Sequence, residues 1–311
     1  MEDLVTVVIT TYKRSDKIEN AIISVIKQTY KNIEIIVVDD NALLEDEREK
    51  TKKIVEKYKQ VKYIQNDKNL GGALSRNVGI ENAKGKFIAF LDDDDKYEKE
   101  KIEKQYNCYL QHKNDNAGLI YCYCYREDQY GNIIGSYKND YEGNRIYENM
   151  LGCIAGTSLW FCPKEALISV GMFEDTPCKQ DSIMLLKLLC NGYNIYRVPE
   201  NLVYYYEHGG NGISGTKRSN IIGLQNYRNW CRKNYDKITK RQQDNVEFDF
   251  SKQLITLYIF NDMKKEAKEE LKNMIKRKPL NKKTWISLGK IVFPKQYLRT
   301  LERKKNEQNS I

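Results

Sequence analysis

The chain has 311 residues, of which 41% are hydrophobic and 31% charged, so it is globular rather than disordered and large enough for two domains. Its net charge of +9 is concentrated at one end: residues 217–311 carry 24 Lys and Arg against 10 Asp and Glu, whereas residues 1–216 carry 28 against 33. The two histidines, His112 and His208, are too few for a histidine-rich metal site.

Strand and helix patterns alternate through the first part of the chain. Apolar runs predict strands at Val5–Thr10, Ile33–Val38, Val61–Gln65 and Phe87–Leu91. Helical spacing predicts helices through Ile18–Ile26, with Ser15 as the N-cap, and at 45–58 and 73–83. This alternation, with strands that are apolar throughout, predicts an α/β fold whose mainly parallel sheet is flanked by helices on both faces.

The pattern changes to mixed strands and short helices between residues 117 and 206. It predicts strands at Tyr121–Tyr125, Ser158–Phe161 and Leu202–Tyr206, and a helix at 181–191. From residue 217 onward the patterns are helical. We therefore predict a catalytic domain at 1–216 and a basic helical region at 217–311.

Polar residues follow three of the predicted strands. These are Thr10 to Tyr12, Asp39 to Asn41 and the run Asp92 to Asp95. A single polar strand end is as readily explained by a solvated turn as by a ligand-binding site. Three polar strand ends in one open α/β sheet instead indicate a binding site in the crevice at the carboxyl ends of the strands, where ligands bind.

The four consecutive aspartates at 92–95 are the most specific feature. Their charges repel one another unless a cation neutralises them, and carboxylates joined by substrate phosphates are the ligands that Mg²⁺ and Mn²⁺ prefer. A bridging metal would stabilise the charge on a departing diphosphate. The alternatives are a charged surface loop or a Ca²⁺ site, although the EF-hand spacing is absent.

The segments VTVVITTYKR, IIVVDDN and LSRNVGIENAKGKFIAFLDDDD resemble the family 2 glycosyltransferases of GT-A fold, which are inverting enzymes common in bacterial polysaccharide synthesis. The resemblance continues through GCIAGTSLWF, Gln180-Asp181 and GYNIYRVPENLVYYYEHGGNGIS, and covers about residues 1–216 in order. It implies a Rossmann-like GT-A domain that transfers a sugar from a nucleotide-diphosphate donor, expected to be a UDP-sugar, to a hydroxyl of a glycan or a lipid-linked acceptor.

The resemblance assigns roles to individual residues. It implies that Asp92 and Asp94 form the DxD motif that holds Mn²⁺ or Mg²⁺, that His208 completes the metal site, and that Asp181 is the general base. Gln180 stands where the family usually has Glu, and we expect this departure to affect tuning or acceptor contacts more than the base itself. The expected donor-binding residues are Thr10, Tyr12, Arg14, Asp39, Asp40, Arg76, Asn77, Asp92 and Asp93; the expected acceptor-binding residues are Thr157, Ser158 and Gln180.

There is an alternative interpretation without a catalytic role for Asp181 and His208, and another for the glycines that follow His208. Asp181 precedes a predicted helix, where a carboxylate also serves as an N-cap. His208 could be a surface histidine before a loop. Gly210, Gly212 and Gly215 spell GxGxxG, but the dinucleotide fingerprint belongs at the first strand of a fold and is followed by a second parallel strand, so we set a nicotinamide site aside.

The basic C-terminal region allows several partners. Its amphipathic helices would pack on the catalytic domain or form a homodimer, whereas its basic, aromatic end, with Trp285 and Phe293, would suit an anionic membrane surface. Nucleic acid ranks last because no recognition motif is present. We expect no spanning segment, no signal peptide and reduced thiols, hence a cytoplasmic protein at or near the inner face of the membrane.

Two other functions compete with a transferase. A non-catalytic nucleotide-binding partner of another glycosyltransferase is favoured only by Gln180, and Asp92, Asp94 and Asp181 argue against it. A nucleotidyltransferase would usually show a glycine-rich loop after the first strand, where this chain has Thr-Thr-Tyr-Lys-Arg. We therefore predict a metal-dependent glycosyltransferase.

Overall fold

The computed structural model describes residues 2–207 and 218–300. The chain divides into two compact units, Met1–Asp175 with Gln180–His208, and Thr176–Lys179 with Gly209–Ile311. The boundary that we predict between residues 216 and 217 lies outside the described residues.

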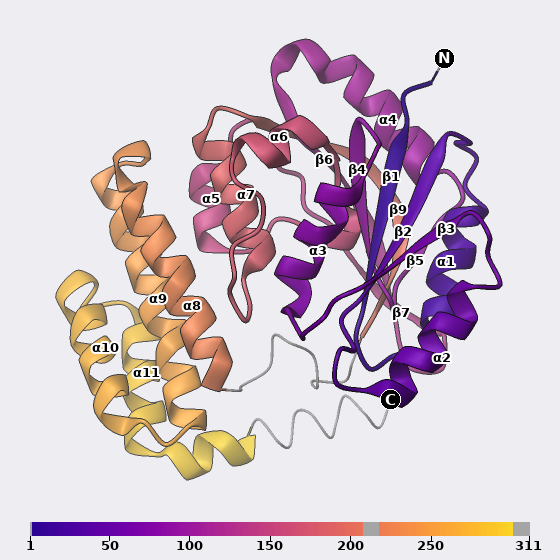
Figure 1. Cartoon of the computed structure of the whole chain (residues 1–311). Helices are drawn as coiled ribbons and strands as arrows, with labels where there is room; N and C mark the ends of the chain where they lie inside the picture. Colours follow the sequence, from indigo (N-terminus) through magenta and orange to yellow (C-terminus); the bar gives the residue numbers. More distant parts are fainter. Residues whose placement is uncertain (1, 208–217, 301–311) are drawn as a thin grey trace. The chain divides into compact units, whose positions relative to one another are not determined.

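Four parallel strands form one half of the sheet in the first unit, in the order β3-β2-β1-β4 (Figure 1). They are β1 (Val5–Thr11), β2 (Ile33–Asp39), β3 (Val61–Gln65) and β4 (Phe87–Asp92). Figure 1 shows α3 (Gly71–Asn82) on one face of these strands and α1 (Ile18–Ile26) and α2 (Glu45–Val55) on the other. The apolar strands are therefore covered on both faces, as their continuous hydrophobic pattern predicts.

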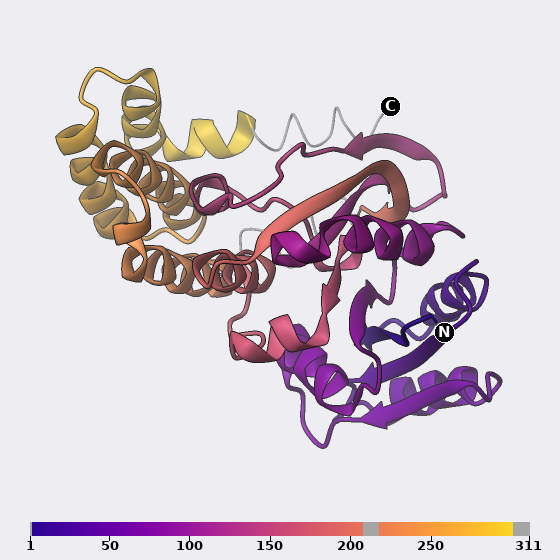
Figure 2. The same cartoon turned by 90° about the horizontal axis from the view of Figure 1, so that it is seen from above.

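The other half of the sheet is mixed and continues in the order β8-β6-β9-β5. Strand β8 is antiparallel to both β4 and β6, and β9 is parallel to β6. Strand β5 is antiparallel to β9, and β7 is antiparallel to β6. Figure 2 shows the long, curved β9 running beside β6. The bounds are β5 (Lys96–Tyr97), β6 (Ala117–Glu127), β7 (Ile133–Tyr137), β8 (Phe161–Pro163) and β9 (Asn194–Tyr206). The prediction of a mainly parallel, mixed sheet is confirmed.

Two local predictions are wrong. Ser15 does not cap α1, which begins at Ile18 with Lys17 at the N-cap position and no side-chain cap. The chain instead makes a tight turn, in which the Lys17 amide donates to the Arg14 carbonyl at 3.0 Å. The predicted strand at Ser158–Phe161 is a 3₁₀ turn at Thr157–Leu159 followed by β8.

Four further helices complete the first unit. They are α4 (Lys101–His112), α5 (Ile146–Leu151), α6 (Lys164–Ser169) and α7 (Gln180–Cys190). Helix α7 is buried along almost its whole length, because six of its eleven residues are Ile, Met or Leu. The residues at its first turn are therefore held by a helix that is packed into the unit.

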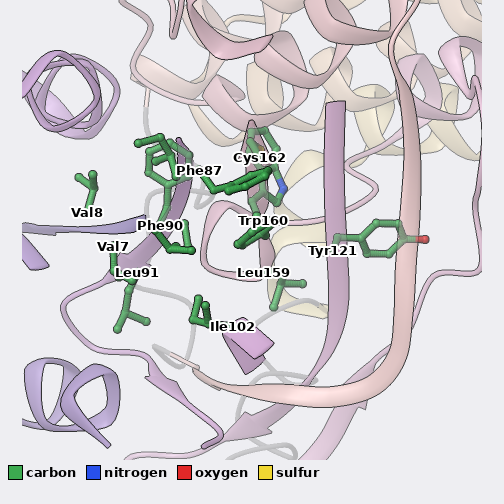
Figure 3. Close-up of a cluster of buried hydrophobic side chains, with 14 of the residues drawn as sticks. Val7, Val8, Phe87, Phe90, Leu91, Ile102, Tyr121, Leu159, Trp160 and Cys162 are labelled. Carbon is green, nitrogen blue, oxygen red and sulfur yellow. The ribbon is translucent and has the colours of Figure 1, made fainter. Parts of the chain in front are cut away.

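Aromatic packing fixes the strand that leads to the aspartates (Figure 3). Phe87 stacks on Phe161 with ring centroids 5.0 Å apart, and Phe90 meets Trp160 edge-on at 6.5 Å. Trp160 is fully buried, and its indole N–H donates to the Ala155 carbonyl at 3.0 Å. The carboxyl end of β4 thus projects from a close-packed core and not from a mobile loop.

Helix α3 lies unusually close to β1. A Cβ built on Gly79 would lie 2.2 Å from Cγ1 of Val8, so only glycine fits at this crossing. We expect Gly79→Ala to lower the free energy of unfolding by about 1–3 kcal/mol, because overpacking forces the helix away from the strand. Urea unfolding measures this change.

Gly289 in α11 (Lys282–Val292) provides the matched control for that substitution. It is also a helical glycine, but nothing lies within 4 Å of a Cβ built there. Gly289→Ala should leave stability unchanged or raise it by up to about 1 kcal/mol, since alanine is the better helix former. Equal effects of the two substitutions would contradict the close crossing of α3 and β1.

The described part of the second unit is helical, as predicted. Its helices are α8 (Arg218–Lys233), α9 (Lys240–Phe260), α10 (Lys264–Arg277) and α11 (Lys282–Val292). Helix α9 begins with a capping box between Thr239 and Gln242. None of the helices in the described ranges is long and apolar enough to span a bilayer.

A buried cluster of charges connects three of these helices. Arg228 on α8 lies 2.6 Å from Glu247 on α9 and 2.7 Å from Glu270 on α10. Glu247 also accepts hydrogen bonds from Arg232 at 2.6 Å and from the Tyr235 hydroxyl at 2.8 Å. Burial alone would raise the pKa of Glu247, but the hydrogen bonds from Arg232 and Arg228 outweigh it and hold the pKa at about 2.

We expect Glu247→Gln to destabilise the helical unit by about 3–5 kcal/mol at neutral pH, because it leaves Arg228 and Arg232 with Glu270 as their one remaining counter-charge in the cluster. The pKa of Glu247 is lowered on folding, so its contribution is present above pH 4.5 and is lost as the pH falls toward 2. Urea unfolding at pH 7 and pH 3 should therefore show a smaller difference between variant and wild type at the lower pH. Glu269 is an exposed residue on α10, and Glu269→Gln should have no such effect. A loss of stability in Glu247→Gln that is the same at pH 7 and pH 3 would contradict the role assigned to the Glu247 carboxylate.

Candidate functional site

Strand pairing brings the predicted strand ends together at one edge of the sheet. Thr10 on β1 pairs with Asp92 on β4, and Thr11 pairs with Asp39 on β2. The parallel strands all end at this edge, so the three polar segments are neighbours, as the sequence predicts. Tyr12 follows directly, with 41% of its side chain exposed.

Arg14 neutralises two of the four aspartates. Its Nη1 lies 2.9 Å from Asp93 Oδ1 and 2.8 Å from Asp94 Oδ2. Asp93 also accepts a hydrogen bond from the Tyr12 backbone N–H at 3.2 Å. Burial, aided by the charge of Asp94, still raises the pKa of Asp93 to about 6 against the opposing effect of Arg14. The turn after β1 is therefore tied to the aspartate run by charge.

Asp92 belongs to a second cluster, which reaches from β4 to α7. Its Oδ1 lies 2.6 Å from Nη2 of Arg76, whose Nη1 donates to Gln180 Oε1 at 2.9 Å. The Asp92 backbone N–H donates to the Ser158 hydroxyl at 3.1 Å. Arg76 is buried, and its guanidinium carbon lies 5.8 Å from the centre of the Phe173 ring. Arg76 on α3 thus links Asp92 on β4 to Gln180, the residue before the expected base.

Asp95 is a residue whose position the sequence reasoning missed. It is 1% exposed, and its Oδ1 accepts the backbone N–H of Tyr206 at 3.0 Å. Burial and then the charges of Asp94 and Asp92 raise its pKa well above the usual range. Asp95 therefore ties the end of β9 to the aspartate run. The alternation of side chains along an extended segment could have indicated this position. Asp93 and Asp95 are buried, whereas Asp92 and Asp94 are half-buried.

Asp39 and Asp40 are buried, and their carboxylates are bound within the protein. Asp39 accepts from the Tyr63 hydroxyl at 2.5 Å and from the Asn41 amide at 2.8 Å. Burial raises its pKa even though Tyr63 opposes the shift. Asp40 accepts from the Asn66 side chain and from the backbone amides of Leu70 and Gly71, each at 2.8 Å. Asn66 is a further residue that the sequence gave no reason to single out.

Asn77, Thr157 and Ser158, which we also expect to contact a ligand, are hydrogen-bonded or buried within the protein. Asn77 exchanges two hydrogen bonds with the Phe173 backbone, at 2.8 and 2.9 Å. Thr157 and Ser158 are 7% and 2% exposed in the turn before β8. The structure thus gives Asn77 and Ser158 positioning contacts within the protein, and their contact with donor or acceptor stays a prediction.

Asp181 lies in the first turn of α7 and not at its N-cap, because the helix begins one residue earlier, at Gln180. Its Oδ1 accepts from the Ser182 backbone N–H at 2.6 Å, and its Oδ2 accepts from the Cys153 thiol at 3.1 Å. Asp181 is half-buried and Cys153 is exposed. A weak thiol donor leaves this oxygen open to a competing hydroxyl.

The residues that could hold a divalent cation are the two aspartates of the DxD motif. Within residues 2–207 and 218–300, no group of three or more His, Cys, Asp and Glu side chains converges as a complete metal site. Asp92 and Asp94 nevertheless fit a Mg²⁺ or Mn²⁺ site of the kind that takes one or two carboxylates and completes its shell with phosphate oxygens and water. His208 lies outside the described residues.

Comparison with known proteins identifies the family. The model of the family "Glycosyl transferase family 2" matches residues 6–174, which is more than half of the chain. An uncharacterized glycosyltransferase of Haemophilus influenzae is 28% identical over 302 residues, covering 94% of this chain and 97% of its own. The putative teichuronic acid biosynthesis glycosyltransferase TuaG of Bacillus subtilis is 36% identical over 106 residues, 33% of this chain and 40% of its own.

Other relatives are matched over part of their length. An uncharacterized glycosyltransferase of Methanocaldococcus jannaschii is 36% identical over 136 residues, so the match spans 43% of this chain and 46% of the relative. Among solved structures, S. aureus TarS residues 1–349 in complex with UDP-GlcNAc aligns with a TM-score of 0.57 at 17% identity, covering 88% of this chain and 89% of that one. This similarity confirms the GT-A fold, and together with the family match it shows that the chain belongs to glycosyl transferase family 2.

Proposed function

We propose that this protein is an inverting glycosyltransferase that moves a sugar from a UDP-sugar to a hydroxyl of a glycan or lipid-linked acceptor. The observation that carries the proposal is the convergence of Asp92 and Asp94 with Arg14 and Arg76 at the carboxyl end of β4. Cations beside carboxylates at such an edge suit a diphosphate and a divalent metal together. The TarS complexes with UDP-GlcNAc and UDP, which share the fold, support UDP as the nucleotide.

The reaction would be a single displacement with Asp181 as the base. Asp181 takes the proton of the acceptor hydroxyl, and the acceptor oxygen bonds to the anomeric carbon. The bond from that carbon to the diphosphate oxygen breaks, and UDP leaves with the electron pair. Inversion follows from attack opposite to the leaving group, and it needs no enzyme nucleophile. An oxygen that is only weakly bound supports this role: Oδ2 of Asp181 accepts the Cys153 thiol, a weak donor that an acceptor hydroxyl would displace.

The residues of the aspartate run would bind the donor. Tyr12, exposed at the end of β1, would stack on the base, with Thr10, Asp39 and Asp40 along the same edge. Arg76 and Arg14 carry the charge that the diphosphate requires. Their present partners are Asp92, Asp93 and Asp94, so we propose that the donor and its cation take over part of these ion pairs.

We propose Mn²⁺ or Mg²⁺ as the cofactor, held by Asp94, Asp92 and His208. Such a cation would supply positive charge to the departing diphosphate. A neutral imidazole ligand would favour Mn²⁺ over Mg²⁺.

The helical unit supports a location at the inner face of the membrane. Helix α11 and the residue after it expose Trp285 (58%), Ile286 (50%), Val292 (55%) and Phe293 (61%), with Lys282, Lys283 and Lys290 on the same helix. Such a helix suits peripheral binding to anionic lipid, where a lipid-linked acceptor would lie. The same face would serve a homodimer. The name of TuaG supports an acceptor in bacterial surface polysaccharide synthesis.

Calorimetry of nucleotide binding tests the donor. UDP, dTDP, GDP and CDP are titrated into the wild-type protein with and without Mn²⁺. We expect UDP to bind in a manner that depends on Mn²⁺. Preference for another nucleotide would change the donor, and the absence of binding by all four would favour a non-catalytic partner of another glycosyltransferase.

A further inference from the structure

Two tyrosine rings lie side by side on one face of the sheet, close to the aspartate run. Tyr137 on β7 pairs with Cys124 of β6, and Tyr205 on β9 pairs with Arg126 of the same strand. Positions 124 and 126 are two residues apart, so these side chains project from one face. The two ring centroids are 6.2 Å apart and the planes meet at 81°, which is an edge-to-face pair.

Both rings are available to a ligand. Tyr137 is 49% exposed and Tyr205 is 37% exposed. Every residue of β7 is exposed, so this strand adds no side chain to the core. A pair of aromatic rings that is partly exposed in this way is a candidate binding surface.

An ion pair holds the rings in place. The guanidinium of Arg126 lies 5.0 Å from the centre of the Tyr137 ring, and its Nη2 lies 2.5 Å from Glu207. Gly135, which pairs with Arg126, has a φ of +152°, and a Cβ there would touch the guanidinium at 3.5 Å. Arg126 thus lies beside Gly135 and against the Tyr137 ring.

The rings border the proposed site of transfer. Asp95 anchors the residue after Tyr205 through the Tyr206 backbone N–H at 3.0 Å. The pKa of Tyr205 is raised, first by burial of the phenol and then by the charges of Asp95, Asp92 and Asp94. Tyr205 is thus the residue before the backbone contact that joins β9 to the aspartate run.

We propose that Tyr137, Tyr205, Arg126 and Glu207, which we call the aromatic platform, bind a pyranose ring of the acceptor glycan. The C–H bonds on the face of a pyranose carry partial positive charge, and they are attracted to the negative face of an aromatic ring. Arg126 donates and Glu207 accepts hydrogen bonds, so both suit sugar hydroxyls at the rim. The inference rests on the proposed function, since it takes the acceptor to be a glycan.

Saturation-transfer NMR tests the platform directly. The probes are the methyl β-glycosides of glucose, galactose and N-acetylglucosamine at millimolar concentration, without nucleotide. We expect the wild type to bind at least one probe, and Tyr137→Ala and Tyr205→Ala to bind it about two- to tenfold more weakly. Tyr205→Phe keeps the ring and should retain most of the signal.

Tyr130→Ala is the matched control. Tyr130 is 80% exposed in the turn before β7, and its substitution removes an exposed ring from the same hairpin. It should leave the signal unchanged. The proposal is overturned if no probe gives a signal with the wild type, or if Tyr130→Ala weakens binding as much as Tyr137→Ala.

UDP titration of the same preparations separates this inference from the proposed function. Retained UDP binding with no sugar signal would overturn the platform alone. Sugar binding that depends on Tyr137, without binding of UDP, would support the platform and overturn the proposed donor. Circular dichroism shows whether each variant folds; if Tyr205→Ala does not, Tyr137→Ala and Tyr205→Phe decide the result.

Discussion

Replacing Asp181 by asparagine is expected to slow sugar transfer by about 10²- to 10⁴-fold while UDP binding stays unchanged. Asparagine keeps the shape of the side chain and its oxygen acceptor toward the Ser182 amide, but it cannot take a proton at neutral pH. The readout is the release of UDP from UDP-glucose, UDP-galactose or UDP-N-acetylglucosamine, whichever the wild type consumes fastest. Water serves as the acceptor where no glycan is supplied.

Glu165→Gln is the control for that substitution. Glu165 is also an acidic residue in the first turn of a helix, α6, but it is exposed. Its neutralisation should not change turnover. If Asp181→Asn kept more than a tenth of the wild-type rate, Asp181 would not be the base, and a fall in UDP affinity would instead indicate a role in donor binding.

Asp94→Asn should remove the dependence of UDP binding on Mn²⁺ and lower turnover by about 10²- to 10³-fold. The amide oxygen is a weaker ligand for a hard cation than a carboxylate. The substitution also removes the ion pair with Arg14, which leaves that guanidinium with Asp93. Titrations of UDP with and without Mn²⁺ measure the loss, and turnover follows from UDP release.

Two comparisons make the result with Asp94 specific. Asp46→Asn removes an exposed carboxylate from the first turn of α2 and should change neither Mn²⁺ dependence nor turnover. Thermal unfolding of Asp94→Asn without ligand shows whether the fold is intact. A folded variant that still responds to Mn²⁺ as the wild type does would exclude Asp94 as a metal ligand.

The positions of the strands could be predicted from the sequence because their signal is local. Val5–Thr10 and Phe87–Leu91 are short apolar runs that can only be buried, and polar residues mark where each of them ends. The order in the sheet then places Thr10 beside Asp92. The prediction of these strand ends depends only on residues that are neighbours in the chain and on the fact that parallel strands end at the same edge of a sheet.

The partners of the site residues could not be predicted in the same way. Arg76 meets Gln180 across 104 positions, and Asp95 meets Tyr206 across 111. Local periodicity contains no information about such pairs, because they depend on how the second half of the sheet folds back. The sequence predicts the start of α7 to within one residue, and that one residue decides between the N-cap and the first turn for Asp181.

The contact of Asp40 with the first amides of α3 has a consequence for the proposed binding of a diphosphate. The start of a helix carries about half a positive charge, and many nucleotide-binding folds place the pyrophosphate there. In this chain a carboxylate already accepts the Leu70 and Gly71 amides at that end, so the helix dipole is compensated by the protein itself. In the proposed function, side-chain cations and a metal would then hold the diphosphate, and donor affinity would depend on ionic strength more steeply than with a cradle of backbone amides.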